Sequence, residues 1–267
     1  MSDFRCGTVA FAGRPNTGKS SLLNALLGEK LAIVSAKAQT TRHLLTGVLT
    51  AGDCQYLLVD LPGYQTRHPG MLNRALNRSA VAGARDSDAV VFVIEALRYG
   101  PEDRAVLARI PRQARLVAAI NKIDLVRNRA DLLPFLQRLS HEREFAALVP
   151  VSARAGENLP ELLRVLREGL PLSPAAYPVG QLTDRDERFF AVEILREKLF
   201  RRLGEELPYR CDVALESFRE EGRLRRVEAT IWVERDRHKP IVIGAAGATL
   251  KRIASDARRD MQARFGG

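Results

Sequence analysis

The chain has 267 residues, of which 46% are hydrophobic and 28% charged. This composition is typical of a folded globular protein and excludes a disordered or fibrous chain, and no uncharged apolar run approaches the roughly 18 to 20 residues that cross a bilayer. The 42 basic and 32 acidic residues leave a net charge of +10, which favours a polyanionic partner such as nucleic acid or an acidic membrane surface. The three cysteines have no metal-binding or redox spacing, so we expect reduced thiols and a cytoplasmic location.

Short apolar runs alternate with amphipathic stretches up to about residue 170. The runs are rich in Val, Ile and Leu and predict strands at 8–12, 56–59, 89–94, 116–120 and 147–151. The stretches between them have a helical period and predict helices at 20–27, 73–84, 102–109, 132–144 and 159–170. This alternation predicts an α/β fold with a mostly parallel sheet covered by helices on both faces, which binds its ligand at the carboxyl ends of the strands.

A phosphate-binding loop follows the first predicted strand and precedes the first predicted helix. Its sequence, Gly-Arg-Pro-Asn-Thr-Gly-Lys-Ser, satisfies the pattern G-x-x-x-x-G-K-[ST], whose backbone N–H groups surround phosphate oxygens. We expect Lys19 to reach the β- and γ-phosphates and Ser20 to bind Mg²⁺. The predicted nucleotide-binding residues of this loop are Gly13, Arg14, Pro15, Asn16, Thr17, Gly18, Lys19 and Ser20.

The tetrapeptide Asn-Lys-Ile-Asp at 121–124 follows another predicted strand and indicates guanine as the base. Asp124 can accept hydrogen bonds from both N1–H and the 2-amino group of guanine, whereas adenine offers neither donor and would leave the carboxylate unpaired. Asn121 is expected to support the loop and the purine edge, and the stem of Lys122 to lie along the base.

Two more strand ends complete the predicted nucleotide site. Asp60 ends the second predicted strand, where it would hold Mg²⁺ through water, and the Gly63 N–H would then be available to the γ-phosphate. After the last predicted strand, the Ala153 N–H would contact guanine O6. The remaining predicted contacts are Leu61, Pro62, Ile123, Ser152 and Arg154.

A polar segment between the phosphate loop and Asp60 contains adjacent threonines. GTPases place here a threonine that coordinates Mg²⁺ only when the γ-phosphate is present. Our choice is Thr41, and Thr40 is the alternative. The predicted Mg²⁺ ligands are therefore Ser20, Thr41 and Asp60, and the predicted catalytic residues are Lys19, Thr41 and Gly63.

Slow hydrolysis is expected from the residue that follows Gly63. Ras-type GTPases have a glutamine there to orient the attacking water. This chain has Tyr64, which cannot act in that way, and Gln65 is displaced by one position. A partner or a monovalent cation would then be needed for faster turnover.

The second half of the chain has a different character. A segment rich in proline predicts a linker at 173–181, which separates a domain at 1–172 from an α+β domain at 182–267. Helices are predicted at 185–204 and 248–265, and strands at 211–218 and 226–234.

The motif Gly-Ala-Ala-Gly precedes the final basic helix and fits the GXXG loop of a KH domain, which clamps about four nucleotides of single-stranded RNA. Two pairs of basic residues repeat at i, i+7 on exposed flanks of that helix. The predicted RNA-binding residues are Gly244, Ala245, Ala246, Gly247, Lys251, Arg252, Arg258 and Arg259.

Taken together, these motifs resemble the Era GTPase family of bacteria over nearly the whole chain. The resemblance is carried by the phosphate loop, Gln-Thr-Thr-Arg-His, Asp-Leu-Pro-Gly, Asn-Lys-Ile-Asp and Val-Ser-Ala, and by Asp-Arg-Asp-Glu-Arg-Phe at 184–189 and Glu-Ile-Leu-Arg-Glu-Lys at 193–198. It implies a P-loop GTPase domain followed by a type II KH domain, with GTP or GDP, Mg²⁺ and a potassium ion at Asn16 as ligands.

The same resemblance implies binding near the 3′ end of small-subunit ribosomal RNA and assistance to assembly of the small ribosomal subunit. It also implies some peripheral association with the inner face of the cell membrane, and we expect a monomer. Family members usually carry lysine or another polar residue inside the GXXG loop, so Ala245 and Ala246 predict weaker RNA binding. The family also continues beyond residue 267 into a last KH strand and a closing helix, so we expect this KH domain to be incomplete.

Two other interpretations stay open from the sequence. One is an RNA-binding assembly scaffold with a purely structural nucleotide site, which Tyr64 and the basic charge favour. The other is a GTPase that acts on membranes or in tRNA modification, with an incidental GXXG loop. The complete set of Mg²⁺ and guanine motifs argues against the first, and the segment 184–198 argues against the second.

Overall fold

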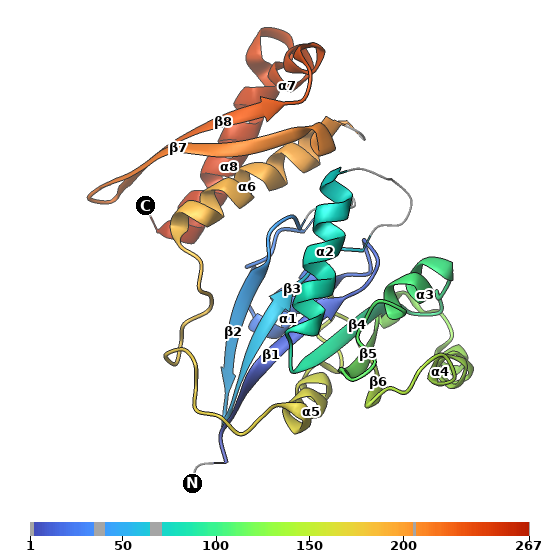
Figure 1. Ribbon diagram of the computed structural model, residues 1–267. Helices are drawn as coiled ribbons and strands as arrows, with labels where there is room; N and C mark the ends of the chain where they lie inside the picture. Colours follow the sequence, from blue (N-terminus) through green and yellow to red (C-terminus); the bar gives the residue numbers. More distant parts are fainter. Residues whose placement is uncertain (1–2, 35–40, 65–70, 205–206, 267) are drawn as a thin grey trace. The chain divides into compact units, whose positions relative to one another are not determined.

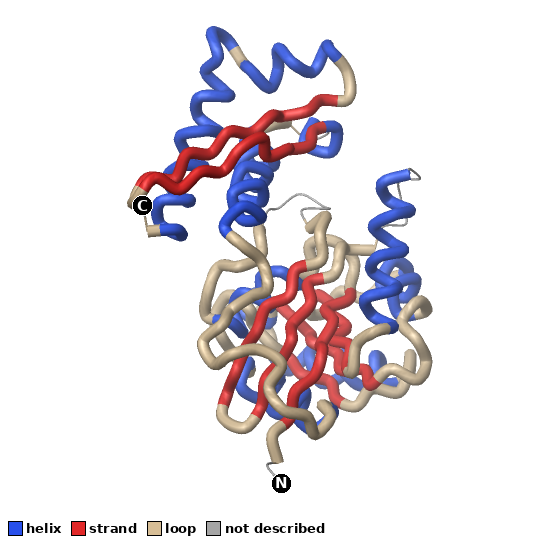
Figure 2. Tube along the Cα trace, turned by 60° about the vertical axis from the view of Figure 1, so that its left-hand side comes forward, coloured by secondary structure: helices blue, strands red, loops and turns tan. Residues whose placement is uncertain are grey.

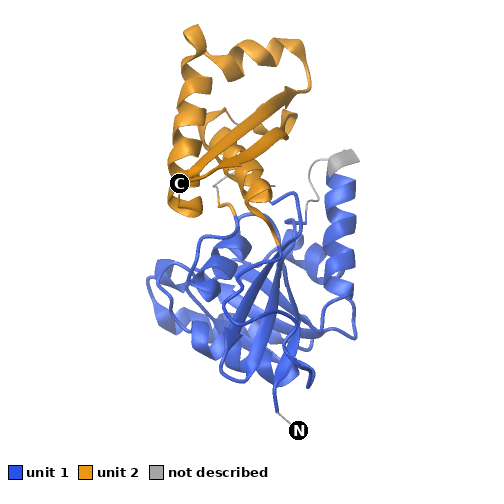
Figure 3. Ribbon diagram, turned by 90° about the vertical axis from the view of Figure 1, so that its left-hand side faces the viewer, with its two compact units in different colours: residues 1–32, 41–184 blue, residues 33–40, 185–267 orange. Residues whose placement is uncertain are grey.

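The computed structural model describes residues 3–34, 41–64, 71–204 and 207–266 (Figure 1). The chain divides into two compact units, one formed by residues 1–32 and 41–184 and the other by residues 33–40 and 185–267 (Figure 3). Within the described part of the chain, none of the helices combines the length and apolar character needed to cross a membrane.

A six-stranded sheet is the centre of the first unit (Figure 2). Its strands, in spatial order, are β2 (Leu45–Ala51), β3 (Cys54–Asp60), β1 (Arg5–Ala12), β4 (Ala89–Glu95), β5 (Arg115–Asn121) and β6 (Ala147–Pro150). Neighbouring strands are parallel except for β2 and β3, which form an antiparallel hairpin. The predicted α/β fold with a mostly parallel sheet is confirmed.

The sequence analysis missed β2, although it predicted the other five strands. Threonines and a glycine interrupt the apolar residues of Leu45–Ala51, so the segment lacks the continuous apolar run by which the other strands are recognised. At the edge of the sheet this mixed pattern is sufficient, because β2 pairs with a strand, β3, on one side, while its other side is met by an isolated bridge between Gly47 and Thr183.

Helices cover both faces of this sheet (Figure 1). The α-helices in the described part of this unit are α1 (Lys19–Leu27), α2 (Met71–Arg85), α3 (Pro101–Leu107), α4 (Leu132–Ser140) and α5 (Leu159–Gly169). Buried side chains of α2, α3 and α4 share one apolar cluster with β4 and β5, in which Phe92 and Ile120 are fully buried. On the opposite face lie α1 and α5. The carboxyl ends of β1, β4 and β5 therefore meet at one edge, where their following loops converge.

The proline-rich segment 173–181, predicted as a linker, is attached to the first unit. The side-chain oxygen of the buried Gln55 accepts hydrogen bonds from the backbone N–H groups of Ala176 and Tyr177, at 2.8 and 2.9 Å, and its amide nitrogen donates to the Tyr177 carbonyl at 2.8 Å. Prolines prevent this segment from forming a helix or strand, and the Gln55 side chain satisfies some of its backbone groups instead. The division between the units falls after residue 184.

The second unit combines an antiparallel hairpin with helices (Figure 3). Its elements are α6 (Glu187–Arg202), β7 (Cys211–Glu221), β8 (Leu224–Val233), α7 (Lys239–Ile243) and α8 (Ala248–Phe265). Leu199 of α6, Val213 of β7 and Ile253 of α8 belong to one buried cluster, so both long helices pack on the hairpin. This confirms the predicted α+β character of the C-terminal part of the chain.

Candidate functional site

The phosphate loop leaves β1 and ends on the first turn of α1. Gly18 has a φ of +97°, and a Cβ added there would collide with the side-chain amide of Asn121. A Cβ added at Gly13 would collide with the Val93 carbonyl of β4. These approaches require glycine. Because α1 begins at Lys19, its unpaired N–H groups face the loop, and this arrangement binds phosphate.

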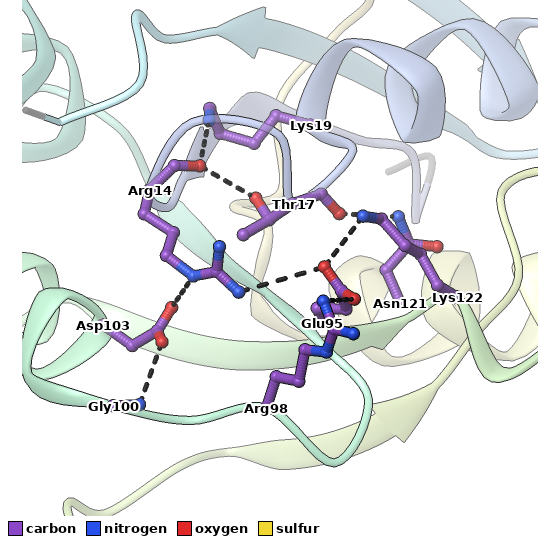
Figure 4. Close-up of polar contacts among 9 residues, drawn as sticks. All are labelled: Arg14, Thr17, Lys19, Glu95, Arg98, Gly100, Asp103, Asn121 and Lys122. Carbon is purple, nitrogen blue, oxygen red and sulfur yellow. Dashed lines mark hydrogen bonds and ion pairs between the residues drawn. The ribbon is translucent and has the colours of Figure 1, made fainter. Parts of the chain in front are cut away.

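The Lys19 ammonium lies inside the phosphate loop. Its side chain is buried, and Nζ donates to the Gly13 carbonyl at 3.1 Å and to the Arg14 carbonyl at 3.0 Å, the second of which is drawn in Figure 4. Burial lowers the pKa of Lys19 from 10.5 to about 8, and the nearby charge of Asp60 opposes this shift. Burial therefore disfavours the charged form of Lys19 in the nucleotide-free protein, and phosphate oxygens would restore its ordinary protonation.

This pKa predicts that GDP binding weakens in mildly alkaline solution. Free protein loses the Lys19 proton as the pH rises through about 8 and must regain it when phosphate binds. The Kd for GDP should therefore rise about tenfold between pH 7 and pH 9, and change little between pH 6.5 and 7.5. Titration calorimetry in buffers of different ionisation enthalpy should show matching proton uptake at pH 8.5. A Kd that is flat from pH 7 to 9 would contradict the assignment.

The three predicted Mg²⁺ ligands lie together. Ser20 Oγ and Thr41 Oγ1 donate to Asp60 Oδ2 at 2.6 and 2.9 Å, and the two hydroxyls are 3.1 Å apart. Asp60 is fully buried, and its other oxygen, Oδ1, has no hydrogen-bond partner among the described residues. Burial raises the pKa of Asp60, while Ser20 and Lys19 lower it. A buried carboxylate oxygen beside two hydroxyls fits a divalent cation that prefers oxygen ligands.

Residues 61–64 are placed differently from one another. A Cβ added at Gly63 would be 3.1 Å from Pro15 of the phosphate loop, so the two backbones are in close approach. Leu61 is fully buried in the core, so its side chain faces away from the nucleotide site. Tyr64 also packs into that core, with the Arg109 guanidinium 4.8 Å from its ring centroid. Among the described residues, the side chain that follows Gly63 is therefore a buried tyrosine and cannot orient water as a glutamine would. The alternatives Gln65 and Thr40 lie outside the described residues.

Asn121 connects the guanine tetrapeptide to two other loops. Its Nδ2 donates to the Thr17 carbonyl at 2.9 Å (Figure 4), and its Oδ1 accepts from the Ala153 N–H at 3.0 Å. The Ala153 N–H, predicted to contact guanine O6, is therefore directed at Asn121 in this structure. The amide of Asn121 therefore holds protein loops together, and its contact with the purine edge stays a prediction.

Asp124 is held at the surface by Ser152. The buried Ser152 Oγ donates to Asp124 Oδ1 at 2.7 Å and accepts from the Ala155 N–H at 3.0 Å. Asp124 is exposed, so its second oxygen can meet a base from solvent. Ile123 packs in the core below it, whereas Arg154 is exposed.

Lys122 lies beside Asp124 with a left-handed backbone, at a φ of +67°. Its Nζ donates to Glu95 Oε2 at 2.9 Å (Figure 4). Asn16 of the phosphate loop also has a positive φ, +64°, and an exposed side chain. Glu95 and its neighbour Asp103 were missed by the sequence analysis, because they belong to no motif.

The GXXG segment connects α7 to α8 in the second unit. Gly244 and Gly247 have φ values of +76° and +78°, and a Cβ on Gly244 would lie 2.8 Å from the Thr249 backbone nitrogen. Ala245 and Ala246 are exposed and lie just before the start of α8. This geometry suits phosphate binding through the backbone.

The four predicted basic residues of α8, Lys251, Arg252, Arg258 and Arg259, are all exposed. They flank the buried residues Ile253 and Ala257, as the helical spacing predicts. Sequence analysis missed the exposed apolar side chains next to the loop, which are Ile241, Ile243 and Leu250. Exposed apolar groups beside a basic helix provide a surface on which bases can pack.

These features define a P-loop GTPase domain joined to a KH domain. The sequence model of the 50S ribosome-binding GTPase family matches residues 8–122, and that of the KH domain matches residues 206–267. GTPase Era of Nitrosomonas eutropha is 46% identical over 266 residues, which are 100% of this chain and 90% of that protein. GTPase Era of Pseudomonas putida is also 46% identical, over 98% of this chain and 87% of its own length.

Solved structures agree with these relatives. A tyrosine-to-alanine variant of Aquifex aeolicus Era bound to GDP.AlF4− has a TM-score of 0.93 and 32% identity, covering 98% of this chain and 90% of that one. Era in complex with MgGDPNP and nucleotides 1506–1542 of 16S ribosomal RNA has a TM-score of 0.93 and 31% identity, covering 99% and 90%. The chain belongs to the Era GTPase family, whose members hydrolyse GTP.

Proposed function

We propose that this protein binds the 3′ end of small-subunit ribosomal RNA under the control of GTP, and thereby assists assembly of the small ribosomal subunit. The observation that carries this proposal is one chain that holds both a complete guanine-nucleotide site and an exposed GXXG loop. The Era complex with MgGDPNP and nucleotides 1506–1542 of 16S ribosomal RNA supports the choice of RNA. Cytoplasmic location, peripheral membrane contact and the monomeric state stay predictions.

In the proposed reaction, Ser20, Thr41 and Asp60 hold Mg²⁺, which would neutralise phosphate charge when bound. Lys19 and the N-terminus of α1 bind the phosphates, and Gly63 offers its N–H to the γ-phosphate. Because Tyr64 packs inward, it does not position the attacking water, and hydrolysis is expected to be slow. We extend the proposal to a potassium ion near Asn16; faster hydrolysis in potassium than in sodium would support it, and equal rates would oppose it.

A selectivity assay tests the proposed function against its alternatives. The labelled 3′-terminal RNA of the small subunit should bind more tightly than a scrambled RNA of equal length, at one stated salt concentration. A scaffold with a structural nucleotide site would bind the RNA equally in every nucleotide state. A GTPase that acts on tRNA would prefer tRNA to this RNA, and either result would overturn the proposal.

The Ala-Ala centre of the GXXG loop predicts that an added lysine strengthens RNA binding. Ala245 is exposed and has no positive φ, so Ala245→Lys would place a cation beside the phosphate groups of a bound RNA without backbone strain. We expect RNA affinity to rise about fivefold at low salt, with a salt slope steeper by about one. Val179→Lys, at a site 83% exposed in the first unit, adds the same charge elsewhere and is the control. Equal gains in both variants would show a non-specific charge effect and contradict the assigned loop.

A further inference from the structure

An ionic network centred on a residue outside the recognised motifs joins the phosphate-binding and base-binding ends of the nucleotide site (Figure 4). Its centre is Glu95, the last residue of β4. In the sheet β4 lies between β1 and β5, and Glu95 is the register partner of Asn121. The phosphate loop follows β1 and the guanine tetrapeptide follows β5, so Glu95 lies between the two loops.

Three cations converge on the Glu95 carboxylate, whose side chain is only 13% exposed. Lys122 of the guanine tetrapeptide donates to Oε2 at 2.9 Å, and the Arg14 guanidinium of the phosphate loop is 3.9 Å from the same oxygen. Arg98 is 3.0 Å from Oε1, but its own side chain is 73% exposed. Glu95 thus bridges one residue from each loop, and the pair with Arg98 is an ordinary surface contact.

Asp103 fixes the orientation of Arg14. Its side chain is 3% exposed, and Oδ1 accepts from Arg14 Nε at 3.0 Å. Oδ2 accepts from the Gly100 N–H at 3.0 Å, at the start of α3. Each carboxylate oxygen therefore has one partner, and Arg14 is held between a helix terminus and Glu95 (Figure 4).

A second connection between the same loops makes this network a closed ring. Asn121 donates to the Thr17 carbonyl at 2.9 Å, and the Thr17 hydroxyl lies 3.1 Å from the Arg14 carbonyl, to which it donates. From Arg14 the ring returns through Glu95 to Lys122, the neighbour of Asn121. The phosphate loop and the guanine tetrapeptide are therefore tied at two points, one through the Asn121 amide and one through ion pairs.

We infer that Arg14 and Glu95 are positioning residues for guanine-nucleotide recognition, which hold the Lys122 side chain and the phosphate loop at a fixed separation with Asp103 as their anchor. The inference deepens the nucleotide-binding role and rests on it. A nucleotide contacts both loops at once, so a fixed separation spares it the cost of ordering them. Loss of the ion pairs through Glu95 should weaken the binding of ligands that contact both loops, and it should lower the selectivity of the site for guanine.

The test is the dissociation rate of fluorescent GDP from the full chain, compared among Arg14→Gln, Glu95→Gln and the double variant. We expect each single variant to release GDP about tenfold faster than the wild type. The double variant should release GDP no faster than the faster single variant, because both substitutions break the same connection between the two loops. Arg98→Gln removes a cation from the same carboxylate and should change the rate less than about twofold.

A second readout separates positioning from a merely structural role. Inosine diphosphate lacks the 2-amino group, so the ratio of GDP to inosine diphosphate affinity reports how well Asp124 and Lys122 are aligned on the base. Glu95→Gln should lower this ratio, whereas simple destabilisation would lower the melting temperature and leave it unchanged. Independent effects that multiply in the double variant, or an unchanged ratio, would overturn the inference. Wild-type protein that fails to bind GDP would instead overturn the nucleotide site itself.

Discussion

Replacing Asp124 with asparagine should transfer the preference of the site from guanine to xanthine nucleotides. The carboxylate can accept from the N1–H and 2-amino donors of guanine, whereas an asparagine amide presents one acceptor and one donor. Xanthine has a carbonyl in place of the 2-amino group and matches that amide. Sites built to pair with a specific polar group reject a mismatched ligand by about 10⁴-fold, so GTP affinity should fall by about 10³-fold or more.

Competition between GTP and XTP for fluorescent GDP, and then for fluorescent XDP, measures this exchange. The hydroxyl of Ser152 can bond to asparagine as it does to Asp124, so the loop should keep its conformation. Asp131→Asn, an exposed aspartate in the same region, is the control and should leave GTP preferred. An Asp124→Asn protein that still selects GTP would show that Asp124 does not read the base.

Gly18→Ala should abolish tight nucleotide binding in a protein that remains folded. Its φ of +97° disfavours any Cβ, at a cost of about 1–2 kcal/mol for a left-handed residue. The added methyl group would also collide with the Asn121 amide, which ties the two loops. Both effects distort the phosphate loop at the start of α1. We therefore expect GDP affinity to fall at least about 100-fold, since several kcal/mol are lost at the binding surface.

The glycine at the other end of the same helix provides a matched control. Gly28 follows α1 with a φ of +71°, but a Cβ added there would meet open space. Gly28→Ala should lower the unfolding free energy by about 1 kcal/mol and leave GDP affinity unchanged within about twofold. Calorimetric GDP titration and thermal unfolding of both variants decide the matter. Equal GDP affinity in the two proteins would refute a specific role for Gly18.

Residues that act through local backbone geometry could be found in the sequence. The phosphate loop is one continuous segment, so its glycines and Lys19 are recognisable from spacing alone. The grouping of Ser20, Thr41 and Asp60 was expected from the phosphate loop, the polar threonine segment and a strand end, and the structure places their oxygens within hydrogen-bonding distance. In such cases chain order and the α/β fold are enough to predict which side chains meet.

Contacts that depend on strand order could not be found in this way. Glu95 meets Lys122 because β4 lies beside β5 in the sheet, and no local pattern states that order. Similarly, the buried Gln55 of β3 binds the segment predicted as a linker, over a sequence separation of more than a hundred residues. Composition indicated a linker at 173–181, because prolines exclude a helix or strand. Composition does not show whether such a segment packs against a domain.

A motif shows which residues lie near the nucleotide site, but it does not show in which direction each side chain points. Leu61 and Ile123 lie inside nucleotide-binding motifs, yet both side chains are buried in the core. The Ala153 N–H, chosen for a contact with guanine, donates to Asn121 within the protein. These differences arise because a motif residue serves the fold and the ligand at once, and only packing shows which role its side chain has.

The central claim is that the state of the nucleotide controls RNA binding. Its most direct test is the Kd of the full chain for the 3′-terminal RNA of the small subunit, measured with saturating GDP and with saturating GDPNP at one salt and Mg²⁺ concentration. We predict tighter binding with GDPNP by about tenfold, a coupling of ordinary size between two ligand sites. Identical Kd values in the two states would contradict the claim.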